Sequence, residues 1–577
     1  MLRITEIKLP LTSAVEKGHT DAEIRAAVVK KLAINAADLL EFSIFKRGVD
    51  ARKASAILLV YSLDVKVNGE AKVLAKFSRD PHVKPAPDSS YKFVATLPAP
   101  QPFTPALGAL APTLVGKPNT GSPLSGEGVS VKPRPIVVGL GPAGLFAALI
   151  LAQSGFKPIV LERGKAVRER TKDTWDFWRK GKLNPESNVQ FGEGGAGTFS
   201  DGKLYSQIKD PKHYGRKVLQ EFVKAGAPPE ILYVSHPHIG TFRLVGMVEE
   251  MRKTIESFGG EIRFQAKVDD IEMGVNSQGH NQVQGVVLAS GERIATNHMV
   301  LAVGHSARDT FEMIDKKGIY IEAKPFSVGF RIEHPQSLID KARFGANAQH
   351  PILGAADYKL VHHASNGRSV YSFCMCPGGT VVASASEVGC VVTNGMSQYS
   401  RNERNANAGI VVGITPEVDF PGNALAGMEL QRKWERQAYV LGGSSYAAPG
   451  QLIGDFLANI PSTQFGEVTP SYTPSVHLTN LESALPEFAI SAIREAIPAF
   501  AKQIKGFDSA DGLLTGVETR TSSPIRIKRD DESLQSINTK GLYPCGEGAG
   551  YAGGILSAGV DGIRVAEAVS LSLASNH

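Results

Sequence analysis

A glycine-rich segment between two apolar runs carries the strongest chemical signal in the chain. Gly139, Gly141 and Gly144 form a GxGxxG pattern. The first glycine allows a tight turn, the second lets the backbone approach a pyrophosphate, and the third lets a helix lie close to a strand. The phosphates would sit at the helix N-terminus, beside Pro142 and Ala143, because free N–H groups there attract anions. The pattern predicts a dinucleotide-binding turn.

An acidic residue follows the next apolar strand at the spacing that such a turn requires. Glu162 comes eighteen residues after Gly144 and is followed by Arg163. A carboxylate there can accept hydrogen bonds from both ribose hydroxyls and would repel a 2′-phosphate. We therefore expect Glu162 and Arg163 to contact the ADP half of a dinucleotide, and we do not expect NADP in this site.

Two later segments favour FAD over NAD. Residues 296–304 are a strand-like run that ends in a glycine turn at Gly304, and residues 541–547 form a late strand ending at Gly546 and Glu547. A Gly-Asp pair at this late position touches the ribityl chain in flavoproteins, and Glu547 departs from it while keeping a carboxylate. The helix that follows would aim N–H groups at the N1/C2=O edge of a flavin. Its expected contact residues are Gly553, Gly554 and Ile555.

A third glycine-rich segment spans residues 191–203. It lacks the Gly-Lys-Ser/Thr ending of a P-loop, so a nucleoside triphosphate site is not indicated. Its place after the first strand–helix pair suits a loop lying against pyrophosphate and isoalloxazine; a flexible surface loop is the alternative. The expected contact residues are Gly194, Gly195, Gly197 and Thr198.

The chain resembles an uncharacterised family of FAD-dependent dehydrogenases found in bacteria and plants. The resemblance rests on FGEGGAGTFSDGKL (191–204), HPHIGT (236–241), GHSARDTFEM (304–313), RIEHPQ (331–336), FCMCPGG (373–379), TNGMS (393–397), ETRTSSPIRI (518–527) and YPCGEGAGYAGG (543–554). It implies FAD in a glutathione-reductase-like Rossmann domain with a family-specific β-rich domain inserted. It implies no particular substrate.

The elements that must position these residues indicate an α/β protein of several parts. Residues 1–80 are expected to form a small α+β domain, guessed to be ferredoxin-like, and residues 81–134 a linker rich in Pro, Gly and Ser. The FAD-binding Rossmann domain would comprise residues 135–320 and 510–577, with a β-rich α+β substrate domain inserted at 321–509. Val268, after a strand at 261–265, is expected to meet the adenine through its backbone.

Several further side chains are candidates with two interpretations each. Cys374 and Cys376 share one face of an apparent strand and form either a buried structural pair or a redox pair; the structural interpretation is favoured because one intervening residue strains a disulfide. No cysteine precedes them, which excludes the CxxxxC mechanism of glutathione reductase. Three histidines are either proton donors or structural residues: His236, His238 and His305. Arg520 and Arg526 either bind a substrate carboxylate or form structural ion pairs, for instance with Glu518.

Composition and charge limit the partners. A net charge of +6 over 577 residues is too weak to predict nucleic-acid or membrane binding. The uncharged run 136–156 is 21 residues long, but its glycines favour a buried strand and helix over a membrane span. Four cysteines without zinc spacing predict a cytoplasmic protein with no metal site.

These patterns predict an FAD-dependent oxidoreductase that exchanges a hydride between flavin N5 and a small organic substrate, with possible transient NAD(P)H. The catalytic residue is not identifiable from the sequence. Two alternatives stay open, namely a flavin monooxygenase or oxidase and a non-catalytic FAD-bound adaptor.

Overall fold

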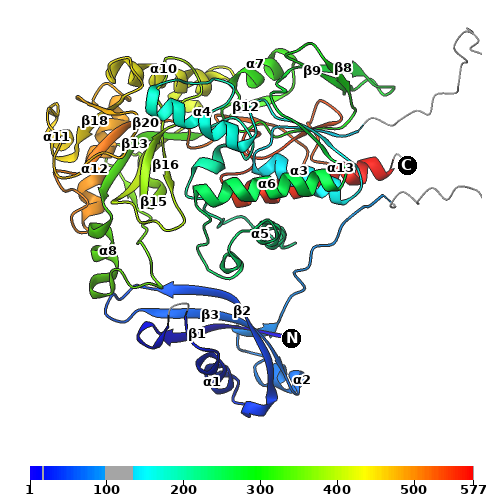
Figure 1. Ribbon diagram of the computed structural model, residues 1–577, viewed down its shortest axis with the longest axis vertical. Helices are drawn as coiled ribbons and strands as arrows, with labels where there is room; N and C mark the ends of the chain where they lie inside the picture. The colour runs from blue at the N-terminus through cyan, green and yellow to red at the C-terminus, as the bar shows by residue number, and fades with distance from the viewer. Residues whose placement is uncertain (16–17, 98–133, 576–577) are drawn as a thin grey trace, which may run out of the picture.

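A small N-terminal sheet stands apart from the rest of the molecule (Figure 1). The structure is a computed structural model that describes residues 1–15, 18–97 and 134–575. The sheet is antiparallel, in the order β2-β3-β1-β4, and α1 and α2 lie on its outer side. This βαββαβ arrangement is ferredoxin-like. Its elements are β1 (Leu2–Pro10), α1 (Asp21–Leu32), β2 (Leu39–Asp50), β3 (Leu58–Val67), α2 (Glu70–Lys76) and β4 (Val83–Pro85).

The N-terminus of α1 follows from its first residues. Thr20 Oγ1 accepts a hydrogen bond from the Glu23 amide, and the Glu23 side chain accepts one from the Thr20 amide, which together form a capping box. Of the segment expected to be a linker, residues 98–133 lie outside the described residues. Before that gap, the amide of Leu97 donates to Ser154 O at 2.9 Å.

A five-stranded parallel sheet forms the centre of the second part. Its order is β22-β11-β5-β6-β7. Successive side chains of a strand point to opposite faces, so Ile136 and Val138 pack into one core and Val137 into another. The strands are β5 (Ile136–Val138), β6 (Ile159–Leu161), β7 (Glu261–Arg263), β11 (Met299–Leu301) and β22 (Leu542–Pro544).

Helices cover one face of this sheet, and a small antiparallel sheet lies on the other. The helices α3, α6 and α13 run side by side (Figure 1). The covering helices are α3 (Pro142–Gln153), α5 (Tyr214–Lys224), α6 (Thr241–Ser257) and α13 (Ile555–Ser575); the opposite face packs against β8 (Val268–Val275), β9 (Asn281–Leu288), β10 (Arg293–Ala295) and α7 (Arg308–Lys316). This is a Rossmann-type α/β arrangement.

An eight-stranded sheet builds the third part, in the order β14-β15-β17-β13-β20-β18-β19 with β16 pairing β15. Its strands are β13 (Phe326–Pro335), β14 (Val361–His363), β15 (Ser369–Ala383), β16 (Thr393–Ser397), β17 (Asn405–Ile414), β18 (Ala448–Leu452), β19 (Val476–Leu478) and β20 (Leu513–Glu518). Its helices are α8 (Gln336–Phe344), α9 (Pro416–Asp419), α10 (Ala426–Leu441), α11 (Ile453–Ala458) and α12 (Glu487–Ala501). The expected boundary at residue 509 thus precedes β20, which belongs to this sheet.

Two short elements connect the second and third parts. β12 (Ile321–Ala323) pairs antiparallel with β21 (Ile525–Ile527), so the chain enters and leaves the inserted part side by side. The helix α4 (Val167–Lys180) lies between the parts, and its Trp178 Nε1 donates to Ala383 O at 2.8 Å. No helix in the described ranges is long and apolar enough to cross a membrane.

Candidate functional site

A cavity of about 650 Å³ opens where the strands of the parallel sheet end. It is bordered by the residues that follow β5, β6, β11 and β22, and it extends to the wall that β15 forms. Ligands of open α/β sheets bind in this position, beyond the carboxyl ends of the strands. The expected site residues that line it are Gly139, Gly141, Pro142, Ala143, Glu162, Arg163, Gly195, Gly197, Val268, Gly304, Glu547, Gly553, Gly554 and Ile555.

The first glycine turn is fixed by close backbone approaches. Gly139 has φ +95°, and a Cβ on it would lie 2.4 Å from Ala302 O. A Cβ on Gly144 would lie 1.9 Å from Gly139 O, so only glycine lets α3 pack this close to β5. Gly144 does not line the cavity. Gly141 caps α3, and the helix therefore starts at the cavity wall.

Glu162 ties three backbone segments together around the cavity. Its Oε2 accepts from the Leu140 amide at 2.8 Å, and its Oε1 accepts from the amides of Gly164 and Gly192 at 2.9 Å each. The side chain is buried. This carboxylate therefore holds the first glycine turn and the third glycine segment in shape, which is a role beyond the expected ribose contact. The ribose contact itself stays a prediction.

Arg163 is held at the cavity wall by two carboxylates and an aromatic ring. It pairs with both carboxylate oxygens of Asp309 at 2.9 Å and with Glu186 at 2.8 Å, and its guanidinium lies 4.1 Å from the centre of the Phe191 ring. Burial would lower the pKa of Arg163, but the two carboxylates raise it, so the group keeps its charge.

The third glycine segment contributes two of its four expected residues to the cavity wall. Gly195 and Gly197 line the cavity, whereas Gly194 and Thr198 lie behind it, against α6. The Gly194 amide donates to Leu140 O at 2.8 Å, which joins this segment to the first turn. Gly194 and Thr198 therefore support the loop from behind, and no part of the described segment is a free surface loop.

The opposite end of the cavity is formed by bare backbone and one carboxyl group. At Gly304, Gly553 and Gly554 an added Cβ would meet nothing within 4 Å, because these positions open onto the cavity. Glu547 is half-buried there, and burial raises its pKa to about 7 although Lys324 acts in the opposite direction. Gly546 does not line the cavity, and its amide donates to Asp561 Oδ2 at 2.8 Å.

This cavity fits an FAD molecule. Glycine backbone borders both of its ends, as close approach by a pyrophosphate and a flat ring requires. The N-termini of α3 and α13 both open onto it. Ala266 and Val268 also line it, and both are buried.

The three candidate histidines separate into different surroundings. His305 lines the cavity, its Nδ1 lies 3.0 Å from Ser306 Oγ, and burial lowers its pKa to about 4, so it is neutral near pH 7. His236 lies outside the cavity, largely exposed and stacked on Tyr205. The Nε2 atom of His238 lies 3.0 Å from Tyr399 O. Only His305 is placed to meet a ligand in the cavity.

The arginine candidates have structural partners. Arg520 pairs with Glu435 through two contacts of 3.0 and 2.9 Å and donates to Ser386 Oγ at 2.6 Å. Arg526 does not line the cavity and donates to Gly550 O at 3.4 Å. The expected partner Glu518 instead binds Arg331, at 2.8 and 3.0 Å. Arg520 thus forms an ion pair with a partner other than Glu518, and it also lines the cavity, so its role toward a ligand stays a prediction.

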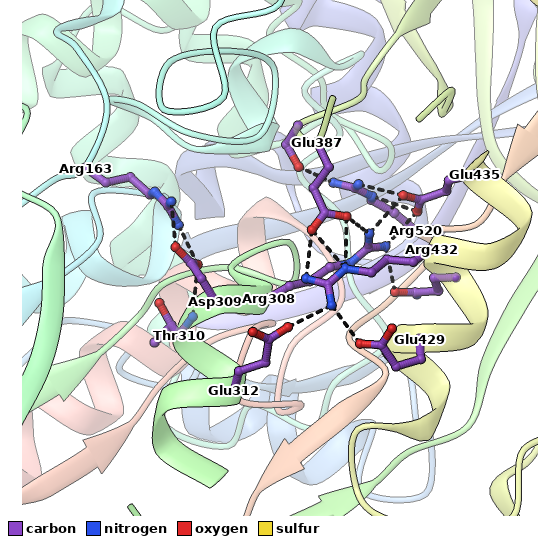
Figure 2. Close-up of polar contacts among 12 residues, drawn as sticks. Arg163, Arg308, Asp309, Thr310, Glu312, Glu387, Glu429, Arg432, Glu435 and Arg520 are labelled. Carbon is purple, nitrogen blue, oxygen red and sulfur yellow. Dashed lines mark hydrogen bonds and ion pairs between the residues drawn. The ribbon is translucent and has the colours of Figure 1, made fainter. Parts of the chain in front are cut away.

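Glu435 is the centre of a buried ionic cluster that joins the Rossmann part to the inserted part (Figure 2). Arg308 of α7 and Arg520 both bind it, and Arg308 also binds Glu387. Burial would raise the pKa of Glu435, but the two guanidinium groups hold it well below its usual range. Glu387, Cys390 and Glu435 lie within 4.8 Å of one another, yet both carboxylates are already bound by arginines, so this group is an ionic cluster and no metal centre.

The structure adds a set of cavity residues that the motif analysis did not single out as site residues. They come from the third glycine segment and from the inserted sheet: Asp201, Lys203, Tyr371, Asn394 and Glu518. Each lies inside a motif segment or a strand, but only the folded chain brings the glycine segment, β15, β16 and β20 to one cavity.

Comparisons with known proteins match two parts of the chain to two different families. Residues 325–521 match a family described as "FAD-dependent protein, C-terminal domain-like", and residues 1–66 match a domain of unknown function. An uncharacterized protein of Clostridium beijerinckii is 45% identical over 568 residues, which are 98% of each chain.

Among solved structures, similarity is distant. A flavoprotein/dehydrogenase from Cytophaga hutchinsonii is 12% identical with a TM-score of 0.35, over 77% of this chain and 79% of that one. CtdE in complex with FAD is 13% identical with a TM-score of 0.30, over 76% and 85% of the two chains. At these scores the likeness has no bearing on the reaction.

Proposed function

The chain belongs to the same family as the Clostridium relative, and because its residues 325–521 match a family of FAD-dependent proteins, we propose that it is an oxidoreductase acting on a small organic molecule. One observation carries the proposal. One cavity among the described residues is lined both by the glycine turns of the Rossmann part and by polar side chains of the inserted part, so a bound cofactor and a second molecule would meet there.

The residues of this chain would have two roles, namely holding FAD and positioning the second molecule. The α3 N-terminus, Glu162 and Arg163 would hold the ADP half, while Gly304, Glu547 and the α13 N-terminus would border the flavin half. Bound FAD supplies a site at N5 that accepts or gives a hydride. The α13 N-terminus would favour negative charge at the far edge of the ring.

The second molecule would bind against the wall that Lys203, Tyr371 and Glu518 form. Lys203 is a cation there, and its ammonium donates to Met375 O. Neutral His305 offers one donor and one acceptor nitrogen at the same cavity. This wall suits a small polar substrate that carries a negative or electron-rich group.

An anaerobic titration of the FAD-loaded protein with NADH and with NADPH tests the proposal. Loss of the flavin absorbance band would identify a reductase or monooxygenase driven by nicotinamide, and rapid substrate-dependent oxygen uptake afterwards would favour the oxidase or monooxygenase alternative. A stable band would direct the search to metabolites as direct donors. A protein that binds no FAD would refute the proposal.

A non-catalytic adaptor is the second candidate, and the separate N-terminal domain favours it. That domain meets the remainder through Arg47, whose amide donates to Tyr233 O at 2.6 Å, and through Asn347, which donates to Ala54 O at 2.7 Å. Deleting residues 1–130 tests the idea. Loss of partner binding with FAD retained would support an adaptor, and flavin turnover that survives the deletion would exclude it.

Location and partners also stay proposals. Free thiols at Cys374, Cys376, Cys390 and Cys545 support a cytoplasmic location, because reducing compartments keep cysteines unpaired. The weak net charge supports a protein without a nucleic-acid partner.

A further inference from the structure

Two cysteines meet at the cavity wall in an irregular part of β15. The pairing of β15 with β17 shifts register between Phe373 and Cys376 and again between Cys376 and Gly379. Cys374 has φ +43°, which is uncommon for any residue with a side chain. Bulges of this kind re-aim side chains, and here the irregularity turns Cys374 to the cavity while Cys376 stays buried behind it.

The thiol of Cys376 is turned back toward Cys374. It donates to Cys374 O, with Sγ 3.3 Å from that oxygen. In a regular strand the side chains at i and i+2 share a face and stand away from the strand's own carbonyl groups. The strand irregularity therefore changes the regular geometry on which the objection of a strained disulfide was based.

Two cations surround this pair. The guanidinium of Arg331 is fully buried and donates to Cys374 O at 2.8 Å, while Lys203 donates to the next carbonyl, Met375 O. The hydrogen bond from Cys376, together with Arg331 and Lys203, lowers the pKa of the Cys374 thiol well below its usual range despite burial. The pKa of Cys376 is raised, first by its bond to Cys374. A thiolate beside a protonated thiol is the arrangement that thiol–disulfide chemistry uses.

The pair also lies near the flavin end of the site. Cys374 and Glu547 line the same cavity, and the charge of Cys374 contributes to the raised pKa of Glu547. The other two cysteines differ from this pair. Cys390 lies in the ionic cluster around Glu435. Cys545 also lines the cavity, just after β22, but it is fully buried, and burial raises the pKa of its thiol.

We propose that Cys374 and Cys376 are a redox-active dithiol that exchanges two electrons with the FAD bound in this cavity. The proposal rests on the proposed function, because it needs a bound flavin. In the oxidising direction the S–H bond of Cys376 breaks, its proton leaves to solvent, and an S–S bond forms between Cys376 and Cys374. The two electrons released pass to oxidised FAD, and the reverse reaction restores thiolate and thiol.

Counting electrons under anaerobic conditions tests this assignment without any substrate. The FAD-loaded protein is oxidised with ferricyanide, freed of oxidant and titrated with dithionite, with flavin absorbance as the readout. The wild type should take up about twice as many electrons per FAD as C374S or C376S, because the dithiol–disulfide couple carries two electrons of its own. The matched variant C390S should behave as the wild type.

Alkylation followed by peptide mass spectrometry gives a second readout. In oxidised holoprotein the peptide with Cys374 and Cys376 should resist alkylation and lack two hydrogens, and after dithionite both thiols should react. Equal electron uptake in wild type, C374S and C376S, with both thiols alkylated in the oxidised protein, would overturn the dithiol. If C376S does not fold, C374S alone decides, because Cys374 is only half-buried. Failure to bind FAD would instead overturn the proposed function and the dithiol with it.

Discussion

The carboxylate of Glu162 accepts a hydrogen bond from the backbone amide of Gly192 at 2.9 Å. This contact joins the end of β6 to the third glycine segment. The amide of Leu140, in the first glycine turn, donates to the same carboxylate. A residue expected only to touch a ribose thus organises the backbone of the candidate site as well. Its two functions are separable by experiment.

Glu162→Gln should destabilise the apoprotein as well as weaken FAD binding. A glutamine side chain has only one acceptor oxygen, so at least one buried amide loses its partner, at a cost of about 1–3 kcal/mol. Urea unfolding of the apoprotein measures this effect. Glu186→Gln is the control, because Glu186 is exposed and meets only Arg163 and its own loop. An unchanged apoprotein would mean that Glu162 acts on the cofactor alone.

Gly144→Ala should prevent α3 from packing on β5. The new Cβ would lie 1.9 Å from Gly139 O, and overpacking of this kind costs about 1–3 kcal/mol or more. Gly246→Ala is the matched control, since Gly246 is also helical and an added Cβ there meets nothing within 4 Å. The control should be neutral or gain about 0.5–1 kcal/mol from helix propensity. Urea midpoints and FAD retention on a desalting column measure both; equal behaviour of the variants would contradict the close approach.

Glu435→Gln should be severely destabilising. Its loss leaves Arg308 and Arg520 buried without their shared carboxylate, and breaking a buried pair from one side costs about 3–5 kcal/mol. Glu429→Gln on the same helix removes only an exposed contact to Arg432 and should cost less than about 1 kcal/mol. Thermal unfolding compares the two, and similar melting temperatures would show that the cluster is not what joins the two parts.

The pH dependence of apoprotein stability should change in Glu547→Gln. Burial raises the pKa of Glu547 from 4.5 to about 7, so the folded state binds this proton more tightly than the unfolded state. The stabilisation is full below pH 4.5 and is lost as the pH rises to about 7. Over this window the unfolding free energy of the wild type should fall relative to that of the variant, by up to about 3 kcal/mol. Parallel urea titrations across the window measure the difference, and a constant difference would refute the shift.

Local patterns were sufficient to predict the parts of the site that depend on neighbouring residues. The turn at Gly139 and the start of α3 each follow from a few consecutive residues. The five-stranded sheet could be anticipated because its strands alternate with helices along the chain.

Contacts between residues far apart in the sequence could not be predicted from such local patterns. The partner of Arg520 is 85 positions away, and nothing near it in the sequence marks Glu435 as the partner. The helix α10 was missed inside a region expected to be β-rich because Gln431 and Glu435 are buried at helical spacing and dilute its apolar stripe. Cys374 meets the cavity through a strand irregularity that residue types alone do not reveal.

The order of strands in the parallel sheet has a consequence for synthesis. β22, at residues 542–544, pairs with β11, and α13 packs on α3, so the last elements of the chain complete a sheet that begins at residue 136. A ribosome must therefore release most of the inserted part before the cofactor cradle can close. During that interval the apolar faces of β5 and α3 are uncovered. The nascent chain therefore exposes apolar surface of the kind that chaperones bind until α13 docks.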